Sequence, residues 1–178
     1  MLKNQKLFSL VIVFVLAFLS PSFAQKKKSD HKKSKQEEKN TKFVAVKKLI
    51  EGRNFVFDAN MAFPAGGQPI DLMSNPGQLV VRKDMAYAGL PYVGQSHVST
   101  YGTQNVGMDF KGKMRDVKFR VNEKKRKIYF SFRVTQNDSY NVSMEIGYDG
   151  GCSVSIISQR KTSISYNGLV SEYENEKK

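Results

Sequence analysis

The feature that most restricts the fold of this chain is an alternation of apolar and polar residues along its C-terminal half. Successive side chains of a β-strand point to opposite faces, so each alternating run predicts a strand with one apolar and one polar face. The runs cover residues 117–121, 128–134, 140–148 and 152–156, and short turn-forming segments separate them. An antiparallel sheet of this kind has one face in water, and its apolar face must be covered by a helix or by the sheet curling on itself.

Residues before these runs predict one helix and several further strands. Phe43, Val46 and Ile50 have helical spacing, and Gly52 follows as a stop signal, which predicts a short amphipathic helix of about three turns from Thr41. The run after the helix has a strongly aromatic face, which predicts a strand. This and the other upstream and downstream strands are predicted at 54–63, 70–73, 78–82, 85–90, 106–110 and 163–166.

Together these patterns predict a mainly β fold of the α+β class. We expect an antiparallel β-meander of about eight to ten short strands with one N-terminal amphipathic helix. A curved sheet and a flattened half-barrel both satisfy the pattern, and the sequence does not distinguish between them. The β domain is expected to span residues 41–170, with a frayed, charged end over 171–178.

The N-terminus has the pattern of a secretory signal peptide. Lys3 and Lys6 precede an apolar run of thirteen residues from Leu7 to Leu19, and small residues end at Ala24. Thirteen residues are short for the ~20 that a membrane-spanning helix needs, so a cleaved signal over residues 1–24 is predicted. Because no cysteine follows the run, we expect an exported protein that is periplasmic or secreted and not lipid-anchored.

A strongly basic segment follows the predicted signal. Residues 25–40 contain no apolar side chain and are predicted to form a disordered, Lys-rich spacer, because they cannot bury surface to offset the entropy of ordering. Residues 25–48 carry ten Lys and three acids, a net charge of +7. An electrostatic contact with an anionic membrane surface stays open as the alternative to a plain solvated spacer.

Charge also bears on the expected partners of the folded part. The whole chain has a net charge of +13, but residues 49–178 account for only +4 of it. A mildly basic domain without a docking motif does not indicate a nucleic-acid partner, and we expect none. We expect a monomer whose partner is a small molecule, a glycan or an envelope protein.

The candidate ligand site is a long loop over residues 91–105. This segment lacks any periodicity, and long loops in compact domains are usually functional or mobile. Tyr92, His97 and Tyr101 lie in it, and Tyr87 lies in the strand before it. Tyrosine rings can stack on a sugar or an apolar ligand while their hydroxyl groups orient it. We therefore predict a non-enzymatic ligand-binding domain, with the alternative that these tyrosines only pack in the sheet and hold the loop down.

An enzymatic function remains open as an alternative. Cys152 and His97 are the only cysteine and the only histidine of the predicted domain, and a thiolate nucleophile needs such a base. However, Cys152 lies in register with the apolar face of its strand, where a buried and inert thiol is usual. Hydrolysis by paired carboxylates is the other enzymatic alternative, and its candidates are Asp58, Asp71, Asp109 and Glu145.

No cofactor or metal site is predicted. His97 with Asp84 and Asp109 lacks the spacing of a metal-ligand set, and the sequence has no glycine-rich phosphate loop between a strand and a helix. With a single cysteine the chain cannot form an intramolecular disulfide. A purely structural interaction module, tethered by the basic tail, is the third functional alternative.

Four segments resemble those of a known family when they are taken in combination. They are NFVF at 54–57, LPYVG at 90–94, MDF at 108–110 and SISYNG at 163–168. The chain resembles the secreted Bacteroidetes domain-of-unknown-function family 4251 from about Leu49 to Val170. The resemblance implies an exported, envelope-associated domain without an established activity, and it assigns no role to any residue.

Overall fold

The computed structural model of this protein describes residues 22–94 and 107–174. Residues 1–21 of the predicted signal peptide over 1–24 and most of the 91–105 loop, including His97 and Tyr101, therefore lie outside the described residues. The chain divides into two compact units, Met1–Lys39 and Asn40–Lys178. The second unit contains the whole β-sheet and both predicted tyrosines that the structure describes, Tyr87 and Tyr92.

Helix α2 (Ser22–Glu51) is longer than the sequence predicts. It includes residues 25–40, for which we predicted disorder. Lys, Gln and Glu are good helix formers, and extending a helix costs much less than nucleating one, so a polar segment can continue the helix that starts in its apolar part. The amphipathic end agrees with the prediction, because Phe43 and Ile50 are buried in the second unit while Val44 is exposed.

A ten-stranded antiparallel sheet forms the second unit. Its strand order is β5-β4-β3-β1-β10-β9-β8-β7-β6, with the short β2 paired to β1. The mainly β, antiparallel fold predicted from the sequence is thus confirmed. The strands are β1 (Asn54–Pro64), β2 (Ile70–Asp71), β3 (Gly77–Arg82), β4 (Met85–Pro91), β5 (Gly107–Lys113), β6 (Arg115–Asn122), β7 (Lys127–Thr135), β8 (Ser139–Ile146), β9 (Gly151–Ser158) and β10 (Ile164–Glu172).

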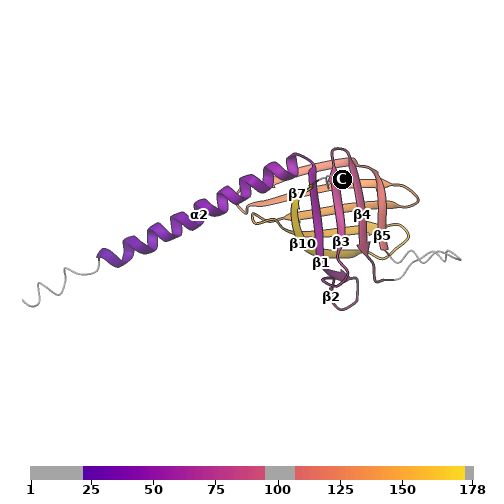
Figure 1. The fold of residues 1–178 in the computed structure, drawn as a ribbon, viewed down its shortest axis with the longest axis horizontal. Helices are drawn as coiled ribbons and strands as arrows, with labels where there is room; N and C mark the ends of the chain where they lie inside the picture. The colour runs from indigo at the N-terminus through magenta and orange to yellow at the C-terminus, as the bar shows by residue number, and fades with distance from the viewer. Residues whose placement is uncertain (1–21, 95–106, 175–178) are drawn as a thin grey trace, which may run out of the picture. The chain divides into compact units, whose positions relative to one another are not determined.

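The sheet curls on itself into a nearly closed barrel. In Figure 1, β1, β3, β4 and β5 form one layer that crosses the strands of the C-terminal half behind it. The first and the last strand pair with each other, which joins the two layers. The free end of the sheet returns to the other layer, because a side chain at Gly112 of β5 would come within 2.8 Å of the Val134 side chain of β7.

Strand β10 is the main difference from the predicted boundaries. The sequence predicts a final strand over 163–166 and a frayed end from 171, whereas β10 continues to Glu172. Asn167 and Gly168 interrupt the apolar pattern and conceal this continuation. Gly168 is required by packing, since a Cβ atom there would overlap the Asp58 carbonyl oxygen and lie 2.9 Å from Cε2 of Phe57.

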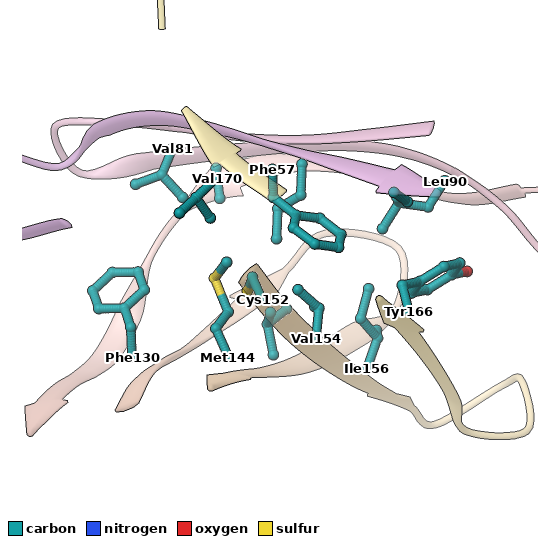
Figure 2. Packing of buried hydrophobic residues seen from close by; sticks show 14 of the residues in the cluster. Phe57, Val81, Leu90, Phe130, Met144, Cys152, Val154, Ile156, Tyr166 and Val170 are labelled. Carbon is teal, nitrogen blue, oxygen red and sulfur yellow. The ribbon is translucent and has the colours of Figure 1, made fainter. Parts of the chain in front are cut away.

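The core lies between the two layers. Figure 2 shows Phe57, Val81 and Leu90 of one layer facing Phe130, Met144 and other side chains of the opposite layer. Aromatic rings contact each other across this core, with Phe55 and Phe130 edge to face at 5.9 Å between ring centroids. Side chains of both layers fill the barrel, and they include the inward positions that alternation predicts for the C-terminal strands.

Candidate functional site

The candidate site lies where β4 ends and β5 begins. We use the term rim for the residues that meet there: Pro91 at the end of β4, Tyr92 after it, Gly107 and Asp109 of β5, and residues 158–162, which lead from the end of β9 toward β10. The rim borders the part of the predicted loop that lies outside the described residues. The contacts of each rim residue determine whether it is structural or available to a ligand.

Tyr92 is buried and is fixed at the rim by the β9–β10 turn. Its hydroxyl group shares a hydrogen bond with the Thr162 hydroxyl group at 2.9 Å. The ammonium group of Lys161 lies 5.1 Å from the centroid of its ring. A second tyrosine secures the same segment, because the Tyr166 hydroxyl group donates to the Pro91 carbonyl oxygen at 2.8 Å. These contacts hold the start of the connection after β4 in one geometry.

Tyr87 lies elsewhere. On β4 the buried Ala86 and Leu90 point inward, so the alternating Tyr87 lies on the outer face of the sheet. The ammonium group of Lys111 lies over its ring, 5.2 Å from the ring centroid. Of the four predicted ligand-contacting residues, the structure thus describes two and places them on different faces. His97 and Tyr101 lie outside the described residues.

An open hollow of about 430 Å³ lies at the rim. Apolar side chains form most of its wall, and Val93 is 54% exposed there. The one ionisable carboxylate among its lining residues belongs to Asp109. The lining residues are Asn75, Pro76, Gly89, Leu90, Pro91, Tyr92, Val93, Gly107 and Asp109.

A second hollow of about 350 Å³ adjoins β5 and the β7–β8 turn. Asp109 lines this hollow too, together with the stacked rings of Phe110 and Tyr140, whose centroids are 4.8 Å apart. Burial raises the pKa of Tyr140, and the neighbouring carboxylates of Asp138 and Asp109 raise that pKa further. Asp109 is therefore an exposed carboxylate that both hollows share.

Sequence reasoning missed the most constrained polar group that contacts the rim, which is Asp138. It is the one buried charged residue in the described part of the chain. One carboxylate oxygen accepts from the backbone N–H of Ser139 at 2.7 Å and of Gln159 at 3.2 Å, and the other accepts from the Ser158 hydroxyl group. The sequence signal for it was an aspartate in a predicted turn, where such side chains often bond to the backbone. Asp138 joins the β7–β8 and β9–β10 turns.

Lys161 completes this polar network. Its ammonium group donates to the Gly107 carbonyl oxygen at the free edge of β5. Partial burial lowers the pKa of Lys161, whereas the Asp109 and Asp138 carboxylates act in the opposite direction. The ammonium group thus satisfies an edge carbonyl of β5 and connects that strand to the β9–β10 turn.

The four carboxylates considered for hydrolysis do not converge. Asp58 accepts from the Gln78 side chain at 2.7 Å, and Glu145 pairs with Lys127. Asp71 accepts from the backbone N–H of Met73 at 2.8 Å and so shapes its own turn. Of these four carboxylates, only Asp109 lines the hollow at the rim or the second hollow beside β5.

Cys152 is buried in the core, as Figure 2 shows. Burial is the main cause that raises the pKa of its thiol far above the usual range, and Glu145 adds to the effect. The thiol therefore stays protonated at neutral pH and is shielded from solvent. This environment is that of a structural cysteine, not of a nucleophile.

We expect native protein to react with a disulfide reagent such as dithionitrobenzoate at least about 100-fold more slowly than denatured protein, because the thiolate forms only when the core opens. Release of the coloured thiolate measures both rates. As a matched control, Cys152→Ala/Ile157→Cys moves the thiol to an exposed outer position of the same strand and should react at the rate of a free thiol. Rapid labelling of Cys152 in the native protein would contradict the buried state.

Neither a metal-ligand cluster nor a membrane-spanning helix is found in the described part of the chain. Within residues 22–94 and 107–174, no three His, Cys, Asp or Glu side chains are placed to hold a metal ion together. Over the same ranges, no helix combines the length and the apolarity that crossing a membrane requires.

Comparison with known proteins identifies the family. The model of a domain of unknown function, DUF4251, matches residues 37–170. A crystal structure of a DUF4251 family protein from Bacteroides eggerthii is similar, with a TM-score of 0.55 and 19% sequence identity, and the match covers 75% of this chain and 87% of that chain. No curated protein matches this chain. The family predicted from four short segments is confirmed: this chain belongs to the DUF4251 family.

Proposed function

We propose that this protein is a non-enzymatic, exported binding domain that holds a small uncharged ligand in the rim hollow. The observation that carries the proposal is the exposed Asp109 carboxylate at the edge of an open hollow with mainly apolar walls. Ligand sites in proteins are typically concave and apolar, with few polar groups that orient the ligand. A volume of about 430 Å³ lies in the range of such sites.

The chemistry of the hollow favours a neutral saccharide over an anion. An ionised carboxylate only accepts hydrogen bonds, so Asp109 favours a ligand with several O–H donors and repels a second anion. Pro76, Pro91 and Val93 offer apolar surface to the C–H face of a sugar ring. The hydrogen bond of Tyr166 to Pro91 keeps this wall in place before binding, which lowers the entropy lost on association.

Binding is better supported than catalysis. Cys152 is buried with a protonated thiol, and the Asp138 carboxylate is saturated by three donors. That leaves Asp109 as an isolated carboxylate in the rim hollow, whereas glycoside hydrolysis ordinarily uses two.

The proposal includes export of the protein and a membrane contact of its basic segment. A signal peptide over 1–24 is supported by its sequence pattern alone. The net charge of +7 over residues 25–48 supports an electrostatic contact with an anionic membrane surface, and an exported protein rarely meets nucleic acid. We propose a monomer that stays near the envelope through this segment.

We expect neutral disaccharides such as cellobiose and maltose to shift the backbone amide signals of Gly89, Val93 and Asp109 in a ¹⁵N correlation spectrum. Asp109→Asn should weaken the binding by about tenfold or more, because a hydrogen bond to a charged group is worth about 1.5–3 kcal/mol. Titration of each disaccharide into the labelled protein gives the affinity.

The control variant is Asp84→Asn, which removes an exposed carboxylate that is paired with Lys113. Asp84 lines neither the rim hollow nor the second hollow. It should leave the affinity unchanged. Signals that shift only away from the rim, or an Asp109→Asn variant that binds as tightly as the unchanged protein, would disprove the rim as the binding site.

A further inference from the structure

The positive charge of the folded domain is concentrated in one short segment. Residues 111–127 contain nine Lys and Arg and two acids, a net charge of +7. Residues 49–178 as a whole have a net charge of only +4, so the rest of the domain is slightly acidic. The segment consists of the end of β5, all of β6, the β6–β7 turn and Lys127, the first residue of β7. A mildly basic domain therefore concentrates its positive charge around one edge of the sheet, strand β6, and the connections on either side of it.

Part of this charge is not neutralised within the domain. Two of the nine cations, Lys113 and Lys127, have carboxylate partners. A further one, Arg126, donates to the Asn40 side chain at 2.8 Å. Four exposed cations have no ion pair within the part of the chain that the structure describes: Arg115, Lys118, Lys124 and Lys125.

Strand register continues the basic edge into a row of hydroxyl groups. Lys118 of β6 pairs with Ser131 of β7, which pairs with Ser143 of β8, and that residue pairs with Ser155 of β9. The inward residues alternate with these serines, so the row lies on the outer face. Neighbouring strands are about 4.8 Å apart, so the hydroxyl groups recur at that spacing across the sheet. We use the term serine face for Lys118, Arg120 and this row.

A shallow hollow of about 150 Å³ lies on the serine face. Arg133 is fixed beside it, because its guanidinium group donates to the Asn141 side chain at 2.9 Å and pairs with Asp116 at 3.2 Å. The hollow thus has a polar wall that is already ordered. Its lining residues are Asp116, Lys118, Ser131, Phe132, Arg133, Asn141, Val142 and Ser143.

We propose that the serine face binds a segment of an acidic polysaccharide, with the carboxylates of the polymer against Lys118 and Arg120 and its hydroxyl groups against the serine row. Charge complementarity selects an anionic partner. The regularly spaced hydroxyl groups add hydrogen-bonding sites that suit a polymer of sugars. This surface differs from the rim, and the proposal does not depend on the ligand of the rim hollow.

Other polyanions fit this face less well. Stable binding to a bilayer ordinarily adds apolar side chains that insert into it, and Ile157 is the one large apolar side chain exposed on β9. Single-stranded nucleic acid binds by stacking bases on open aromatic rings. On the serine face, the ring of Tyr129 is already covered by the guanidinium group of Arg120 at 5.8 Å.

The test uses the full chain and polygalacturonate as the probe, with affinity measured by calorimetry at constant ionic strength. We expect Lys118→Gln/Arg120→Gln to weaken binding by about tenfold or more. Ser131→Ala/Ser143→Ala should weaken it about threefold while leaving the charge unchanged. The basic segment over 25–48 contributes equally in every variant, so the differences report on the serine face.

The matched control is Arg53→Asn/Lys83→Asn, which removes the same charge from two exposed positions outside the serine face and the rim and should change the affinity less than twofold. Equal losses in this control would mean that net charge alone is responsible and would overturn the proposal. So would an unchanged affinity in the serine variant. Phosphatidylglycerol vesicles and single-stranded DNA serve as competing probes. If the protein binds either probe more tightly than polygalacturonate, and Lys118→Gln/Arg120→Gln abolishes that binding, the partner of the serine face is that probe and not a polysaccharide. Asp109→Asn should leave polygalacturonate binding intact.

Discussion

Substitution of Gly168 by alanine is expected to destabilise the protein by about 3 kcal/mol or more, the upper range for overpacking a closed core. The added methyl group would overlap the carbonyl oxygen of Asp58 and press on the Phe57 ring. A backbone atom cannot move aside as a flexible side chain can, so β1 and β10 would have to separate at the register irregularity between Ala59 and Met61. Urea unfolding followed by far-ultraviolet circular dichroism measures the free energy.

The matched control is Gly89→Ala in β4. A Cβ atom at Gly89 has its nearest neighbour, the Asp109 carboxylate, at 3.9 Å, so the change should alter the free energy of unfolding by less than about 0.5 kcal/mol. If both variants unfold at the same urea concentration, close packing between β1 and β10 is not what holds the two layers together.

The pairing of β1 with β10 separates the part of the fold that the sequence could predict from the part that it could not. Alternation determines which side chains of a strand face inward, and turn residues determine which neighbouring strands form hairpins. The hairpins from β6 to β10 follow from these local signals. The pairing of β1 with β10 does not, because the paired residues are about a hundred positions apart and no periodicity encodes a partner. Closure of the sheet into a barrel therefore could not be decided from the alternation.

The distinction between local signals and long-range contacts also applies to the residues of the candidate site. The outward position of Tyr87 follows from the inward Ala86 and Leu90, so the sequence contained the information that separates it from the buried Tyr92. The role of Tyr92 could not be derived, because its partner Thr162 is seventy residues away. The serine row was equally hidden, since each serine alone indicates only a polar face. Register, which the sequence does not specify across four strands, brings them into line.

The rim depends on strand ends that polar side chains hold in place. The free edge of β5 is satisfied by the side chain of Gln136, which accepts from the Lys111 N–H at 3.2 Å, and by Lys161, which donates to Gly107. An unsatisfied edge would be open to pairing with another chain. The turns that supply these two side chains are joined by Asp138, so this carboxylate determines the geometry of the rim.

Asp138→Ala is accordingly expected to cost about 3 kcal/mol of stability and to disorder the rim. The change removes the acceptor of three hydrogen bonds, among them those from the partly buried backbone N–H groups of Ser139 and Gln159, at about 1 kcal/mol or more for each bond lost. Amide hydrogen exchange should speed up in the β7–β8 and β9–β10 turns, while β1 and β3, on the other side of the sheet, keep their protection. Asp138→Asn retains one acceptor oxygen and should recover at least half of the lost stability. Equal loss in the Asn and Ala variants would mean that the negative charge, and not the hydrogen-bond geometry, holds the two turns together.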